Sequence, residues 1–215
     1  MKTISRIIVF GDSIAYGKWD PSGGWVQRLR EFVDVTYNLP TAQDIVQVHN
    51  VSIPGETSLY LKTRFESELL PRLLGRNNEI KSSAIILAIG LNDICHKNAR
   101  HERQLTQSEQ QENFLTLISV ARKYTDNIFV LGFTPIDQEK TWKSFPLFEN
   151  QFLSEDVAIY EKKLADFLLS QSVVCVPVYN LLDASTFTDG IHPNGEGHDV
   201  IFEQVKSALI NSNCI

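Results

Sequence analysis

Stretches of consecutive apolar residues alternate along this chain with stretches in which apolar residues recur every three or four positions. The first kind predicts buried β-strands at residues 7–10, 45–51, 84–89, 128–133 and 173–178. The second kind predicts amphipathic helices that include residues 25–33, 59–70, 114–121, 157–167 and 200–209. Strands that are apolar throughout and alternate with helices indicate a parallel sheet covered on both faces. Because no repeat or linker divides the chain, we expect one three-layer α/β domain over residues 1–215.

Composition narrows the class of protein further. The chain has 215 residues, 43% of them hydrophobic and 21% charged, which is ordinary for a globular domain with a full core. Its net charge is −6, and no basic cluster is present that could neutralise phosphates, so we expect no nucleic-acid partner. No apolar run is long enough to span a bilayer, and the apolar stretch 7–10 is too short for a signal peptide.

The cysteines indicate the cellular compartment in which the protein works. Cys95, Cys175 and Cys214 are odd in number and widely spaced, which favours reduced thiols over a disulfide framework. We therefore expect a cytoplasmic protein.

Small, polar and ionisable residues follow each predicted strand. The segments are 11–13, 52–56, 90–93, 134–135 and, beyond the fifth strand, 189–193. Ligands of parallel α/β sheets bind at the carboxyl ends of the strands. Core packing does not require this pattern, so we expect a functional site at this edge.

The residue types at that edge suit acyl transfer. A serine such as Ser13 becomes nucleophilic when a base takes its proton, and His192 can be that base. Asp189 precedes His192 by three residues, so one turn could present both side chains; they could meet directly, or His192 could face Ser13 with Asp189 behind it. The Gly55 N–H, the Asn92 amide and the N–H of Ser13 are candidate donors for a developing oxyanion.

These motifs resemble those of the GDSL, or SGNH, hydrolase family of esterases and lipases. Four blocks occur in order, "FGDSIAYG", "NVSIPGETS", "AIGLNDIC" and "DGIHPNGEGH". The leucine that gives the family its name is Ile14 here, and the Gly-x-Ser-x-Gly motif of α/β-hydrolases is absent. The resemblance implies a flavodoxin-like sheet of five parallel strands, a Ser13–His192–Asp189 catalytic triad, and an oxyanion hole made by Ser13, Gly55 and Asn92.

Purely structural roles are the alternatives for these residues. Ser13 and Asn92 could cap helices, Gly55 could serve a turn, and His192 could lie in a surface loop. Asp12 is expected to hold its turn by bonding loop amides. We predict no metal site and no cofactor, because the segment "HKNARHERQ" after Cys95 fits no zinc spacing and reads as a solvated loop.

The segment 136–152 is long for a loop in a compact domain and has no clear period. It holds four aromatic residues, Trp142, Phe145, Phe148 and Phe152. They could line an acyl or aryl pocket as a flap, or they could simply pin the loop to the body. We take Trp142, Phe145 and Phe148 as candidate pocket residues, with segment 93–108 as a second candidate wall.

The function that best fits these observations is a serine hydrolase acting on carboxylic esters through an acyl-enzyme. Small acyl or aryl esters, lipid esters, thioesters and acetylated sugars all remain candidate small-molecule substrates. One alternative is a non-catalytic ligand-binding module on the same scaffold. Another is a phosphate or nucleotide binder that uses the 11–13 turn, although the chain lacks a glycine-rich loop with a lysine. The sequence does not indicate the oligomeric state.

Overall fold

The computed structural model describes residues 4–38, 45–97, 102–144 and 150–215. Its main sheet has five parallel strands in the order β2-β1-β3-β6-β8. The strands are β1 (Arg6–Gly11), β2 (Gln47–Asn50), β3 (Ser83–Ala88), β6 (Ile128–Leu131) and β8 (Val174–Val176). Each lies within or overlaps one of the five predicted apolar stretches, so the predicted α/β class and parallel sheet are confirmed.

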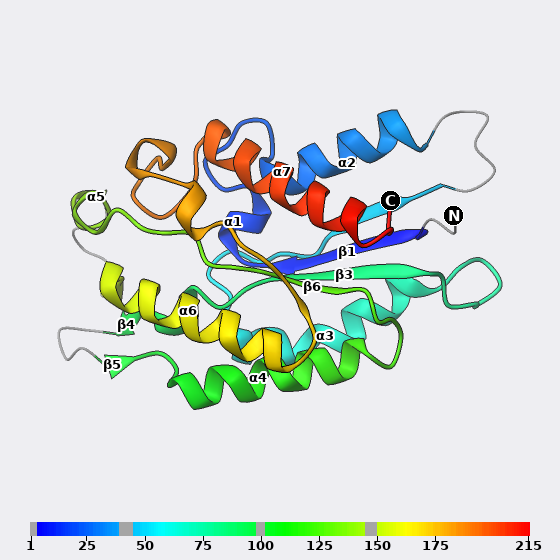
Figure 1. Cartoon of the computed structure of the whole chain (residues 1–215), viewed down its shortest axis with the longest axis horizontal. Helices are drawn as coiled ribbons and strands as arrows, with labels where there is room; N and C mark the ends of the chain where they lie inside the picture. The colour runs from blue at the N-terminus through cyan, green and yellow to red at the C-terminus, as the bar shows by residue number, and fades with distance from the viewer. Residues whose placement is uncertain (1–3, 39–44, 98–101, 145–149) are drawn as a thin grey trace.

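Helices cover both faces of this sheet (Figure 1). On one side lie α2 (Gly24–Thr36) and α7 (Gly195–Asn211), which pack on each other. On the other lie α3 (Ser58–Leu73), α4 (Gln107–Ala121) and α6 (Ser154–Ser170). All five helices were predicted from the apolar period. The structure therefore has the three layers that the sequence pattern indicated.

Each helix buries the row of apolar side chains that its sequence places on one face. In α2 the side chains of Trp25, Leu29 and Val33 recur every fourth residue and are fully buried. Residues Thr106 and Glu109 form a capping box at the start of α4. The buried apolar side chains of strands and helices form one cluster, which encloses β1 and β3.

The order of the strands determines where a site can form. Strand β1 pairs with β2 on one side and β3 on the other, which is the flavodoxin-like order. The chain therefore leaves β1 toward one side of the sheet and leaves β3 toward the other. A crevice opens where these connections diverge, at the carboxyl ends of β1 and β3.

A second, small sheet was not predicted. Strands β4 (His96–Lys97), β5 (Glu102–Arg103) and β7 (Asn150–Gln151) pair antiparallel in the order β5-β4-β7. The expectation of a solvated loop after Cys95 is wrong at His96, which is buried and lies 2.5 Å from the Asp156 carboxylate through its Nε2 atom. This pair joins the small sheet to the first turn of α6.

The segment 136–152 is also more regular than predicted. Residues Gln138–Ser144 form a short helix, α5, where the sequence suggested an irregular loop. Seven residues are too few to display a helical period, which is why the pattern did not reveal this helix.

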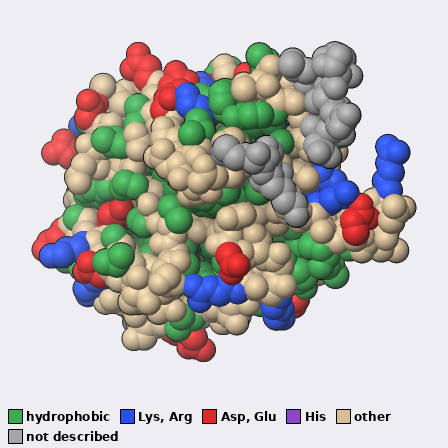
Figure 2. Space-filling model, turned by 45° about the vertical axis from the view of Figure 1, so that its right-hand side comes forward, with side chains coloured by type: hydrophobic (Ala, Val, Ile, Leu, Met, Phe, Trp, Pro, Cys, Tyr) green, Lys and Arg blue, Asp and Glu red, His purple; other side chains and the backbone are tan. Residues whose placement is uncertain are grey.

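The surface carries both charge types. On the face drawn in Figure 2, acidic and basic side chains are interspersed among apolar and polar ones. Within the described ranges, no helix is both long and apolar enough to cross a membrane.

Candidate active site

Strand β1 ends by placing Ser13 at the carboxyl edge of the sheet. Asp12 follows the last residue of β1 and caps the short helix α1 (Ser13–Tyr16), because its Oδ1 atom accepts the N–H of Ile14 at 2.9 Å. Ser13 is the first residue of α1, so its own N–H has no partner within the helix. The Ser13 side chain thus lies above the end of the strand, next to a backbone N–H that makes no bond within α1.

His192 faces Ser13 and is backed by Asp189. The His192 Nε2 atom lies 2.8 Å from the Ser13 Oγ atom, and its Nδ1 atom lies 2.6 Å from Asp189 Oδ2. Both arrangements that the spacing allowed are present, because Asp189 meets His192 directly and also lies behind the ring that faces Ser13. All three residues are buried. Contacts in this order can transfer a proton from a hydroxyl to an imidazole.

The turn that carries Asp189 and His192 is closed by the Asp189 carboxylate. Its Oδ1 atom accepts the backbone N–H groups of Ile191 and His192 at 3.0 and 2.9 Å. Burial on its own would raise the pKa of Asp189, but the hydrogen bonds from the His192 ring and from these N–H groups hold it well below its ordinary value. Asp189 is therefore a carboxylate that stays ionised beside the imidazole.

Gly55 and Asn92 lie on the same cavity as Ser13 and His192. This cavity has a volume of about 280 Å³ and is lined by Ile14, Leu91, Cys95, Phe152 and Ile191, among others. Gly55 has a φ of +80°, which favours glycine, and nothing lies within 4 Å of the position that a Cβ atom would take. The backbone at Gly55 is thus open to close approach from the cavity.

The Asn92 amide is held in place by neighbouring acceptors. Its Nδ2 atom donates to the Glu56 carbonyl oxygen at 3.0 Å and approaches Asp12 Oδ2 at 3.4 Å. The next residue, Asp93, is fully buried and accepts hydrogen bonds from the Ser58 N–H and the Gln110 amide, so it joins α3 to α4. Asp93 is therefore structural, whereas the Asn92 amide reaches the cavity.

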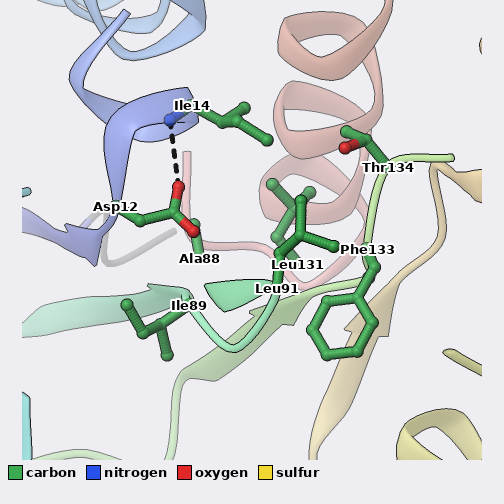
Figure 3. Close-up of a pocket in the computed structure, with 9 residues that line it drawn as sticks. Asp12, Ile14, Ala88, Ile89, Leu91, Leu131, Phe133 and Thr134 are labelled. Atoms are coloured by element: carbon green, nitrogen blue, oxygen red, sulfur yellow. Dashed lines mark hydrogen bonds between the residues drawn. The ribbon is translucent and has the colours of Figure 1, made fainter. Parts of the chain in front are cut away.

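Asp12 has an unusual environment for a carboxyl group. Figure 3 shows it among Ala88, Ile89 and Leu91, with one oxygen turned to the Ile14 N–H. Burial is the main cause that raises the pKa of Asp12 to about 7, and the nearby Asp93 and Glu56 carboxylates add to it. Asp12 thus titrates near neutral pH beside the Asn92 amide.

The four aromatic residues of segment 136–152 differ in where they lie relative to this cavity. Phe152 is buried and lines the cavity of Ser13. Trp142 lies on α5, is 43% exposed and is not among the residues that line this cavity. Phe145 and Phe148 lie outside the described residues.

Helix α5 instead contacts the turn of Asp189. Gly190 has a φ of +95°, and a Cβ atom built there would lie 2.4 Å from Thr141 Oγ1 and 2.5 Å from the Asp137 carbonyl oxygen. The Asp137 N–H also donates to the Gly190 carbonyl oxygen at 2.8 Å. Residues 137–141 of this segment therefore support the Asp189–His192 turn, a role that the sequence did not signal.

Two residues at the site were not singled out by the sequence. Lys18 lines the cavity, and the indole of Trp19 donates a hydrogen bond to Asp189. Trp19 and Asp189 are 170 positions apart, so no spacing could have linked them. Among the described residues, no group of three or more His, Cys, Asp or Glu side chains is arranged to hold a metal ion.

A protein-family model described as GDSL-like Lipase/Acylhydrolase matches residues 7–205. Among curated proteins, none matches the chain.

Several solved structures share the fold at low sequence identity. A GDSL-like lipase from Bacteroides thetaiotaomicron is 16% identical, with a TM-score of 0.69 over 97% of this chain and 89% of that one. An acetylxylan esterase, Axe2, from Geobacillus stearothermophilus is 15% identical, with a TM-score of 0.71 over 96% and 94%. The protein TesA is 21% identical, with a TM-score of 0.66 over 95% and 97%.

Proposed function

Because this chain belongs to the GDSL-like lipase/acylhydrolase family and is a carboxylic ester hydrolase, we propose that it cleaves esters of small acyl groups with Ser13 as nucleophile. The observation that carries the proposal is the contact chain Ser13 Oγ, His192 Nε2, His192 Nδ1 and Asp189 Oδ2, with distances of 2.8 and 2.6 Å. A binding module would not need a serine, an imidazole and an ionised carboxylate in this order.

In the first half of the reaction, Ser13 Oγ attacks the ester carbonyl carbon while His192 Nε2 takes the hydroxyl proton. The ionised Asp189 stabilises the imidazolium and fixes the tautomer. The tetrahedral intermediate then collapses, and His192 gives the proton to the departing alcohol. This leaves the acyl group on Ser13.

In the second half, water replaces the alcohol. His192 takes a proton from the water, whose oxygen attacks the acyl carbonyl, and returns that proton to Ser13 Oγ as the acid departs. In both halves the carbonyl oxygen becomes negative. The Ser13 N–H, the Gly55 N–H and the Asn92 amide are the donors proposed to stabilise it.

The cavity suggests the size of the acyl group. A volume of about 280 Å³ lies near the small end of ligand pockets, which run from about 300 to 1,000 Å³. Its walls include Ile14, Leu91, Cys95, Phe152 and Ile191, beside the polar side chains of Lys18 and Gln104. The apolar side chains favour an apolar acyl group over a polar one, and the small volume favours a short one.

Steady-state hydrolysis of p-nitrophenyl esters from acetyl to decanoyl tests this proposal. We expect kcat/KM to be highest for short acyl chains, and Ser13→Ala to lose nearly all activity while its melting temperature stays close to that of the wild type. Ser185→Ala is a matched control, because Ser185 is an exposed serine that does not line the cavity. Full activity of Ser13→Ala would exclude Ser13 as the nucleophile, and a preference for decanoyl esters would exclude the proposed acyl size.

A further inference from the structure

The indole of Trp19 completes the hydrogen bonding of the Asp189 carboxylate. The Trp19 Nε1 atom donates to Asp189 Oδ2 at 2.7 Å, and this is the same oxygen that accepts from His192 Nδ1 at 2.6 Å. The other carboxylate oxygen accepts the N–H groups of Ile191 and His192. Each oxygen thus receives two hydrogen bonds, and Trp19 supplies the only one that comes from neither His192 nor its turn among the bonds described.

The backbone of Trp19 is held in an unfavourable conformation. Its φ of +68° is in the left-handed region, which is strained for a non-glycine residue. The indole is also 55% exposed, so burial does little to offset that strain. A residue with a strained backbone and an exposed side chain needs an interaction that stabilises its position. The hydrogen bond to Asp189 is such an interaction.

The neighbouring residue fastens this loop to the helix that follows His192. Asp20 is buried, accepts the N–H groups of Ser22 and Gly24, and pairs with Arg28 of α2. Arg28 in turn bonds Asp199 and the Gly195 carbonyl oxygen, both on α7. Because α7 begins three residues after His192, the loop of Trp19 and the turn of His192 are tied to the same helix.

We propose that Trp19 is a positioning residue that holds the Asp189 carboxylate in the orientation in which it supports His192. This inference rests on the proposed roles of Ser13, His192 and Asp189. The indole N–H directs Oδ2 toward the His192 ring and keeps that oxygen from turning to solvent. Two bonds on Oδ2 leave the carboxylate no freedom to rotate away when the imidazole becomes charged.

A role in substrate binding is the competing explanation, because an exposed indole beside a cavity can also stack on a substrate. Trp19→Phe separates the two roles. It keeps an aromatic ring that can stack, although a smaller one, and removes the donor. A positioning role predicts that kcat and kcat/KM fall together, whereas a stacking role predicts a change in KM alone.

For p-nitrophenyl acetate we expect Trp19→Phe to lower kcat by about tenfold, the effect of losing one hydrogen bond to a charged group, with KM nearly unchanged. Tyr16→Phe is the matched control, because Tyr16 is an exposed aromatic three positions away whose hydroxyl has no hydrogen bond described. Its kinetics should equal those of the wild type. Wild-type kcat in Trp19→Phe, or a change in KM alone, would overturn the inference.

A measurement on protein that retains Trp19 guards against misfolding of the Trp19 variant. The indole N–H of Trp19 should exchange slowly with solvent despite the exposure of its ring, and its proton resonance should move when Asp189 is replaced by Asn. Rapid exchange, or a resonance indifferent to Asp189→Asn, would overturn the inference.

These outcomes are distinct from failure of the proposed function. If Ser13→Ala and Asp189→Asn lose activity but Trp19→Phe does not, the proposed triad is supported and the positioning role of Trp19 is excluded. If Ser13→Ala remains active, the proposed function itself falls.

Discussion

At the scale of single residues, the contacts of Asn92 suit its proposed role as a donor to the negative oxygen that forms during the reaction. One bond of its Nδ2 atom, to the Glu56 carbonyl oxygen at 3.0 Å, fixes the plane of the amide. The second contact, to Asp12 at 3.4 Å, is too long to be strong. With the plane of the amide fixed, its second N–H can donate to a developing oxyanion at little cost.

Asn92→Ala should consequently lower kcat by roughly 10²–10³-fold and change KM little, as expected for loss of one oxyanion donor. Steady-state kinetics on p-nitrophenyl acetate, with a melting curve of each protein, measure this effect. A variant in which only KM changes would show that Asn92 positions the substrate and does not stabilise the transition state.

A second prediction at the scale of residues concerns Asp12 and the pH dependence of the stability of the fold. In the unfolded chain its carboxyl group has the ordinary value of 3.8, whereas burial raises the pKa to about 7 in the folded protein. The folded state then binds more protons between these values, so this group lowers the free energy of unfolding as pH rises from about 4 to about 7. Asp12→Asn removes the titration, and an amide oxygen can still accept the Ile14 N–H.

The melting temperature of Asp12→Asn relative to the wild type should therefore increase across that pH range and level off above it. Melting curves from pH 4 to pH 9 measure the difference. A difference that is constant with pH would mean that Asp12 does not titrate in this range, and a decrease would mean that its folded pKa is lowered.

At the scale of elements, helix α5 supports the turn that carries Asp189 and His192. Gly190 sits so close to Thr141 and to the Asp137 carbonyl oxygen that no side chain fits between them. The contact is made partly by backbone, which cannot move aside as a flexible side chain could. The position of α5 and that of the turn are thus linked.

Gly190→Ala should displace the turn and lower kcat by roughly 10²-fold, because catalysis is sensitive to small misplacements of the reacting groups. Gly195→Ala is the matched control. Its Cβ atom would meet only Arg28 Nη2 at 3.6 Å, an ordinary contact, and its φ is not positive. Equal activity of the two variants would show that the turn does not depend on its contact with α5.

At the scale of the whole molecule, much of the fold could be predicted because its signals are local. A continuous apolar run such as residues 84–89 identifies a buried strand without knowledge of its neighbours. Parallel topology then brings the residues after the strands to one edge, which is why Ser13 and His192, 179 positions apart, could be expected at one site.

The features that were not predicted depend on contacts between distant segments. The strands of the small sheet have two residues each, so they are defined by their pairing and not by any period. The burial of His96 depends on Asp156, and the bond of Trp19 on Asp189. The walls of the cavity combine residues from six separate segments, and no local pattern encodes such a combination.

The reactivity proposed for Ser13 depends on the whole molecule, because it requires β1, the Asp189–His192 turn and the cavity together. The most direct test is to react the folded protein with a fluorophosphonate and to locate the phosphonyl group by mass spectrometry of its peptides. We predict a single label, on Ser13 Oγ, that is absent from Ser13→Ala and forms much more slowly in His192→Ala. A label on another residue, or undiminished labelling of Ser13→Ala, would contradict the account.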